Sequence, residues 1–225
     1  MKIGVIPESL LELILLPLGV VPTPVIDTFQ GIVRARAIMV GSKLGIFEAL
    51  RDGDRTAAEV AEQLKTDPRA TEKLLSSLVG AGYLRFNKPR YALTRTARKW
   101  LLADSPVSLH DNMIHRFLEW DVMEFFEDFV RTGKHIDVHA NMSDEQWETY
   151  QRGMRSLAGI SASEVGRRLP VPSAATAMLD VGGSHGYYSV AACRRHPQLR
   201  SSAAPIRHSG ALPPRCETAS ADTDR

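Results

Sequence analysis

Residues 178–197, MLDVGGSHGYYSVAACRRHP, constrain the fold of this chain more than any other stretch. A short apolar run ends at Asp180, passes through glycines and continues with helical spacing until Pro197, which predicts a strand, a tight turn and a helix. Gly182, Gly183 and Gly186 let the backbone turn sharply and approach a ligand where a Cβ would collide. The positive end of the following helix would face that ligand. We expect a nucleotide-like ligand, with Asp180 accepting from it or capping the loop. The alternative is a turn that only packs a helix on a sheet.

Composition narrows the class of protein without identifying it. A chain of 225 residues with 44% hydrophobic content can bury a core, and its length predicts one or two domains, of which we adopt two. The 28 basic and 26 acidic residues leave a net charge of +2, so bulk charge gives no sign of a polyanion partner. The two cysteines, Cys193 and Cys216, form neither a disulfide framework nor a metal-binding spacing. We therefore expect a cytoplasmic protein without a metal.

An apolar segment near the start, Leu10–Val21, could be mistaken for a signal peptide or a membrane span. It contains Glu12 and Pro17 and is shorter than the roughly 20 residues that cross a bilayer. It also lacks a small-residue cleavage pattern. We expect a buried or partner-facing helix and no membrane association.

Residues 27–102 predict a winged helix. Apolar spacing over residues 27–50 indicates two helices interrupted by Gly41 and Gly45. A capping box begins a helix that ends near residue 64, and a second helix spans residues 69–81. Two short strands, 83–86 and 90–93, form a hairpin that precedes another helix. Such a module can bind DNA, so a winged-helix regulator that binds nucleic acid stays open as an alternative, testable by salt-dependent DNA retention. The exposed face of helix 69–81 argues against it, because it offers only Arg69 and Lys73 beside Glu72.

Two further helices are predicted before the glycine turn. Residues 107–130 carry many aromatic residues in one long amphipathic pattern that Gly133 closes, which predicts a large buried face. Ser143 and Gln146 begin the second helix, which ends before Pro170. A short linker, 173–177, then leads to the predicted strand.

A family resemblance rests on several of these segments in order. They are YALT at 91–94, FF at 125–126, VRTGK at 130–134, YQRGM at 150–154 and LDVGGSHG at 179–186. This series resembles the S-adenosylmethionine-dependent small-molecule O-methyltransferases of plants and bacteria. The glycine run is similar to their first cofactor motif, except that Ser184 stands where glycine is usual.

The resemblance implies a fold, a cofactor and partners. The fold class is a mainly α winged-helix dimerisation domain followed by the start of an α/β Rossmann-like methyltransferase domain. It implies a homodimer formed through the amino-terminal helices and a small hydroxylated acceptor molecule. The methionine end of S-adenosylmethionine would be held by Asp180, Gly182, Gly183, Ser184 and Gly186. Met154 would sit over the methyl-donor pocket, although ordinary core filling is an equal alternative.

The resemblance stops after Arg200. The family places a ribose-binding acid near position 205, where this chain has Pro205, and the tail 201–225 shows no hydrophobic period. We expect an irregular, out-of-frame or truncated tail, a strand at 177–181 with both edges exposed, and weak or absent cofactor binding. No catalytic residue is assigned, because the family's histidine base lies further downstream, and His185 is expected to face solvent.

The resulting domain organisation has four parts: 1–106 for the amino-terminal helices and winged helix, 107–172 for a helical connector lining the cleft, 173–200 for the first strand, loop and helix of the cofactor domain, and 201–225 for the tail. A methyltransferase by descent, inactive in this form, is the main interpretation. A dimerising module without catalysis is the remaining alternative.

Overall fold

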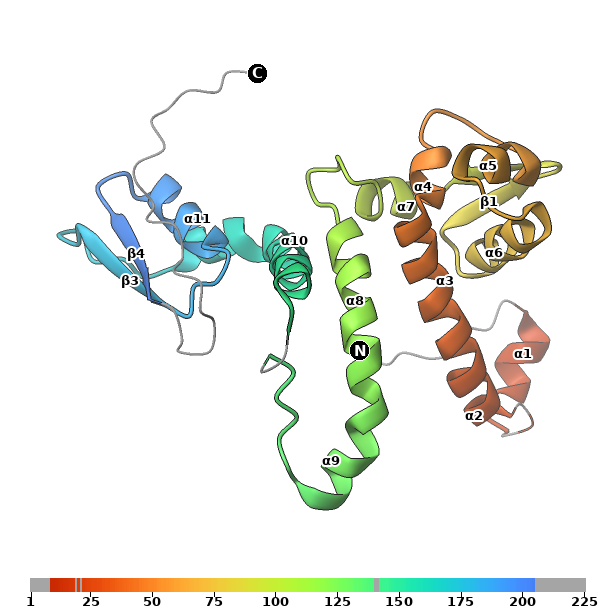
Figure 1. Ribbon diagram of the computed structural model, residues 1–225, viewed down its shortest axis with the longest axis horizontal. Helices are drawn as coiled ribbons and strands as arrows, with labels where there is room; N and C mark the ends of the chain where they lie inside the picture. The colour runs from red at the N-terminus through yellow and green to blue at the C-terminus, as the bar shows by residue number, and fades with distance from the viewer. Residues whose placement is uncertain (1–8, 19, 21, 140–141, 205–225) are drawn as a thin grey trace. The chain divides into compact units, whose positions relative to one another are not determined.

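The computed structural model describes residues 9–18, 20, 22–139 and 142–204, and these form two compact units (Figure 1). The division falls between Arg98 and Lys99, inside one helix and before the boundary predicted at residues 106/107. No helix in the described part of the chain is both long and apolar enough to cross a membrane.

The first unit is a set of helices followed by a hairpin. Its elements are α1 (Leu10–Leu15), α2 (Thr23–Val25), the π-helix η1 (Ile26–Gln30), α3 (Gly31–Leu44), α4 (Ile46–Ala49), α5 (Ala57–Leu64), α6 (Pro68–Gly80), β1 (Leu84–Asn87), β2 (Arg90–Leu93) and α7 (Arg95–Trp100). The predicted capping box is confirmed, since Thr56 and Glu59 cap each other's backbone amides at the start of α5. Asp67 caps α6 in the same way, by accepting from the Ala70 amide at 2.7 Å.

Of the two glycines expected to interrupt the early helices, only one does so. Gly45 has φ of 81° and ends α3 in the left-handed conformation that glycine adopts without strain. Gly41 instead lies inside α3, where a Cβ would meet the side chains of Leu78 and Phe47 at 3.2 and 3.3 Å. Gly41 is therefore a close-packing position and not a break.

The core of the first unit joins α4, α5, α6 and the hairpin. Phe47, Leu50, Val60, Leu78 and Leu93 are all fully buried there, and burial of such apolar side chains stabilises the unit. The antiparallel hairpin pairs Leu84 with Leu93, as expected from the two predicted strands. The arrangement of helices and hairpin matches the order predicted from the sequence.

The second unit contains the long helices and a small sheet. Its elements are α8 (His110–Val122), the 3-10 turn η2 (Met123–Phe125), α9 (Phe126–Thr132), α10 (Asp144–Arg168), β3 (Ala177–Val181), α11 (Tyr187–Arg195) and β4 (Arg200–Ala204). In Figure 1, α10 lies between α8 and α11 and packs against both. The capping box predicted at Ser143 and Gln146 begins α10.

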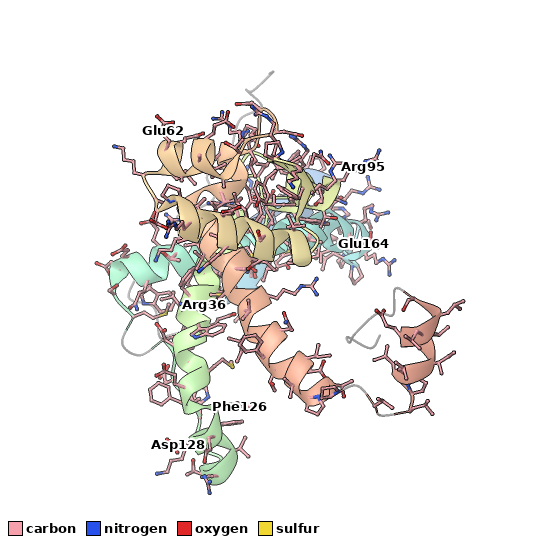
Figure 2. The ribbon with its side chains drawn as sticks, turned by 90° about the vertical axis from the view of Figure 1, so that its right-hand side faces the viewer. Arg36, Glu62, Arg95, Phe126, Asp128 and Glu164 are labelled. Atoms are coloured by element: carbon pink, nitrogen blue, oxygen red, sulfur yellow. The ribbon has the colours of Figure 1, made fainter. Side chains whose placement is uncertain are left out.

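The single helix predicted over residues 107–130 is wrong in two respects. The chain forms α8, η2 and α9 in succession, because the α-helical ladder tightens to 3-10 geometry at Met123–Phe125. The buried face is also smaller than predicted, since Phe125, Phe126 and Phe129 are exposed in the single chain. Figure 2 labels Phe126 near the end of this helical segment. Gly133 does close α9 in the left-handed conformation, as predicted.

The tail predicted to be irregular begins with a strand. Residues 200–204 form β4, which pairs in parallel with β3 and matches Asp180 with Ala203. The expectation that β3 exposes both edges is therefore wrong. The parallel ladder uses backbone groups, so Ser201 and Ser202 can take part without any apolar pattern. Residues 205–225, including Pro205, lie outside the described residues.

Candidate functional site

The turn after β3 has the tight geometry that its glycines predicted. Gly182 and Gly186 have φ of 75° and 67°, and Ser184 between them has φ of 48°. The Gly186 amide donates to the Gly183 carbonyl at 2.7 Å, which closes the turn. Residues 182–186 are called the glycine loop below. Its backbone can lie against a ligand because only one of the three left-handed positions carries a Cβ.

Asp180, near the end of β3, contacts this loop through its carboxylate. The Ser189 hydroxyl donates to Asp180 Oδ2, and the Ser201 hydroxyl donates to Ser189 Oγ at 3.0 Å. A Cβ on Gly183 would lie 2.5 Å from Asp180 Oδ2, so the absent side chain is what lets the carboxylate sit there. The hydroxyls of α11 and β4 thus orient the carboxylate at the carboxyl end of β3.

His185 belongs to the glycine loop and is half-buried, so it faces solvent only in part. The Tyr187 amide donates a hydrogen bond to His185 Nδ1 at 3.1 Å. The His185 ring therefore accepts from the first backbone amide of α11. Burial lowers the pKa of His185 and nearby Arg155 lowers it further, while Asp180 opposes both effects. The ring accepts a backbone hydrogen bond through Nδ1 and in this way shapes the loop.

The helix α10 holds the glycine loop and the first turn of α11 at three levels. The Ser184 hydroxyl donates to Gln151 Oε1 at 2.6 Å, the Arg155 guanidinium lies 5.6 Å from the Tyr187 ring centroid, and the hydroxyls of Ser161 and Tyr188 are 3.0 Å apart. Helical spacing places Met154 on the same face as Gln151 and Arg155, and it is half-buried. The structure thus brings α10 and the glycine loop together, as the family resemblance implied.

Sequence reasoning did not identify Gln151, Arg155 or Ser161. The four-residue spacing of Gln151 and Arg155 is a helical signal, but a sequence does not say which face of α10 meets α11. Small residues mark that face in the structure: a Cβ on Gly166 would lie 2.9 Å from the Ala191 carbonyl oxygen. Beside this contact, α10 and α11 border an open groove of about 350 Å³.

The chemistry of the site is that of a binding loop. It presents backbone groups, small side chains, one half-buried carboxylate and one nearby guanidinium, which suit a zwitterionic ligand with hydrogen-bond donors and acceptors. Within the described ranges, no group of three His, Cys, Asp or Glu side chains is placed to hold a metal ion.

Comparisons with known proteins agree with the fold. Residues 26–103 match the family described as the O-methyltransferase dimerisation domain. The chain is 27% identical to 3-hydroxy-5-methyl-1-naphthoate 3-O-methyltransferase of Streptomyces sahachiroi, over 87% of this chain and 59% of that protein. It is 30% identical to the mitomycin biosynthesis 6-O-methyltransferase of Streptomyces lavendulae, over 78% of this chain and 54% of that protein.

Solved structures share the fold at lower identity. Human N-acetylserotonin methyltransferase in complex with S-adenosylmethionine aligns with a TM-score of 0.71 and 18% identity, covering 88% of this chain and 60% of that one. The chain therefore spans little more than half the length of the proteins that it matches. Within that span, residues 26–103 match a dimerisation domain, the described chain shares a methyltransferase-like fold, and its sequence is similar to those of O-methyltransferases.

Proposed function

We propose that the protein is an S-adenosylmethionine-dependent methyltransferase that methylates an oxygen of a small hydroxylated molecule. Bound S-adenosylmethionine would supply the methyl group to the acceptor oxygen, and the hydroxyl proton that the methyl group replaces would pass to water. The observation that carries the proposal is the glycine loop, held between Asp180 and α10 in a chain related to enzymes of this reaction.

Within that proposal, the methionine end of the cofactor is held by Asp180, Gly182, Gly183, Ser184 and Gly186. Three features support this placement: three left-handed residues in the loop, the close approach of the Asp180 carboxylate to Gly183, and the start of α11 directly after Gly186. Met154 shares the face of α10 that carries Gln151, which supports its place beside the methyl donor.

In this proposal the first unit joins two copies of the chain into a homodimer. Helices α5 and α6 with the β1–β2 hairpin form a winged-helix module, and the apolar helices before it pair with those of a second copy. The order of elements and the match to a dimerisation domain support both parts.

The test is an NMR titration of the full chain with S-adenosylmethionine, which detects weak as well as tight binding. We expect the amides of residues 182–186 to shift, with a dissociation constant in the millimolar range. Binding is expected to be weak because Pro205 stands where a ribose-binding acid is expected, and one charge-assisted hydrogen bond contributes about 1.5–3 kcal/mol.

Gly183→Ala should abolish these shifts, because its Cβ would lie 2.5 Å from Asp180 Oδ2 and displace the carboxylate. Gly80→Ala is the matched control, since a Cβ there meets nothing within 4 Å. Circular dichroism of both variants verifies folding. Unperturbed loop amides at saturating cofactor would reject the proposed function.

A further inference from the structure

We infer that Gln151 is a positioning residue, which fixes the conformation of the glycine loop through its hydrogen bond with Ser184. The inference rests on the proposed function for its consequence, which is that a preset loop binds the cofactor more tightly. Gln151 lies on α10 and Ser184 lies 33 positions later in the chain, so their contact joins two separate elements.

Ser184 occupies a conformation that needs support. Its φ of 48° lies in the left-handed region, which is unfavourable for a residue with a Cβ relative to the right-handed one. Such a residue keeps this conformation when the surrounding structure holds it there. The hydrogen bond from Ser184 Oγ to Gln151 Oε1, with a donor–acceptor distance of 2.6 Å, holds Ser184 in this conformation from outside the loop.

Residues of α10 that follow Gln151 anchor this helix to the first turn of α11. One turn beyond Gln151, Arg155 covers the Tyr187 ring, and Gly159 lies against the same ring with its Cβ position 3.8 Å from Tyr187 Cε1. Ser161 then meets Tyr188 through their hydroxyls. These contacts fix the first turn of α11 against α10, so the side chain of Gln151 reaches the loop from a helix that is already anchored.

The same contact accounts for serine at a loop position where the resembled cofactor motif usually has glycine. A glycine would adopt φ of 48° without strain but would leave Gln151 without a hydroxyl to accept from. Ser184 and Gln151 therefore act as a pair, in which the bond between the side chains offsets the backbone strain. A preset loop lowers the ordering cost of binding a ligand.

The first experiment measures the loop without any ligand. Hydrogen exchange of amides 182–187 is compared in the full chain and in Gln151→Ala, Ser184→Ala and the double variant. Each single variant should exchange about threefold to tenfold faster, because one net hydrogen bond is lost, and the double variant should add little. Gln63→Ala on α5 is the matched control, an exposed helical glutamine of the other unit.

The second experiment repeats the titration with S-adenosylmethionine. Both single variants should raise the dissociation constant by about threefold to tenfold, with no further rise in the double variant. Faster exchange in a chain that never binds the cofactor supports the positioning role and rejects the proposed function instead. Unchanged exchange in both single variants overturns the inference. Tighter binding in both also overturns it, since the contact would then close the loop against the cofactor.

Discussion

Single atoms decide how closely the helices of the second unit approach each other. Gly153 on α10 is buried against α8, and a Cβ there would lie 2.5 Å from His115 Cβ. The Asn112 side chain also donates to the Gly153 carbonyl at 3.3 Å, which fixes the helices at this point. A methyl group at residue 153 therefore has to push α8 and α10 apart.

Gly153→Ala should destabilise the protein by about 1–2 kcal/mol. Overpacking of this kind costs about 1–3 kcal/mol, and the better helix propensity of alanine returns up to about 1 kcal/mol. Urea unfolding followed by circular dichroism measures the difference. Gly159→Ala is the control on the same helix, because its nearest atom is 3.8 Å away, and it should be neutral or stabilising. Equal stability of Gly153→Ala and the unmodified chain would show that the helices separate at no cost.

At the scale of elements, the contact between α8 and α10 also contains a buried titratable ring. His115 is 4% exposed, packs edge-on against Tyr150 with ring centroids 5.3 Å apart, and lies with Nε2 3.4 Å from Glu119 Oε1. Burial lowers its pKa below the ordinary 6.5, Glu119 opposes this shift, and Arg116 and His139 add to it. The folded state therefore binds a proton less readily than the unfolded chain.

This shift predicts that acid weakens the packing of α8 on α10. Since the unfolded chain takes up its proton near pH 6.5, where the folded chain does not, the free energy of unfolding is fully retained above pH 6.5. It should fall as the pH drops below that value toward the lowered pKa of the folded state. His115→Gln should flatten the decline between pH 7 and 5 without abolishing it, because the pKa of His185 is lowered too. His135→Gln, on an exposed segment, is the control. An undiminished decline in His115→Gln would assign the acid sensitivity elsewhere.

The sequence predicted the elements whose signals are local. The capping boxes at Thr56 and Ser143, the left-handed ends at Gly45 and Gly133, and the glycine loop all follow from a few adjacent residues. These devices use short-range backbone hydrogen bonds, which a sequence pattern encodes directly.

The elements that were missed depend on partners distant in the chain. Strand β4 contains Ser201 and Ser202, and its register comes from the ladder with β3 and the Ser201–Ser189 hydrogen bond. Gln151 was missed as a site residue for the same reason, because only the packing of α10 on α11 shows that it reaches Ser184. Apolar periodicity carries no information about such polar and backbone pairings.

At the scale of the whole molecule, the first unit leaves an apolar surface that a single copy does not cover. Helix α1 exposes Leu10, Leu11, Leu13 and Ile14. Phe29 in η1 and Ile32 in α3 are also exposed. Every residue of α1 except Glu12 is apolar, and these apolar side chains spread around most of the helix. Contiguous apolar surface of this kind marks an interface in a soluble protein. Residues 26–103 match a dimerisation domain, so a second copy of this chain is the occupant that we propose.

We predict a homodimer at micromolar concentration that Phe29→Glu dissociates. Phe29 is 63% exposed in the single chain, and placing a carboxylate within the apolar interface without a partner should weaken association by at least about a hundredfold. Sedimentation velocity measures the two species. Val165→Glu, on an exposed face of α10, adds the same charge and should leave the dimer intact, which separates an interface effect from a general effect of net charge. A monodisperse monomer in the unmodified chain would contradict the prediction, and the apolar surface of α1 would then need a different occupant.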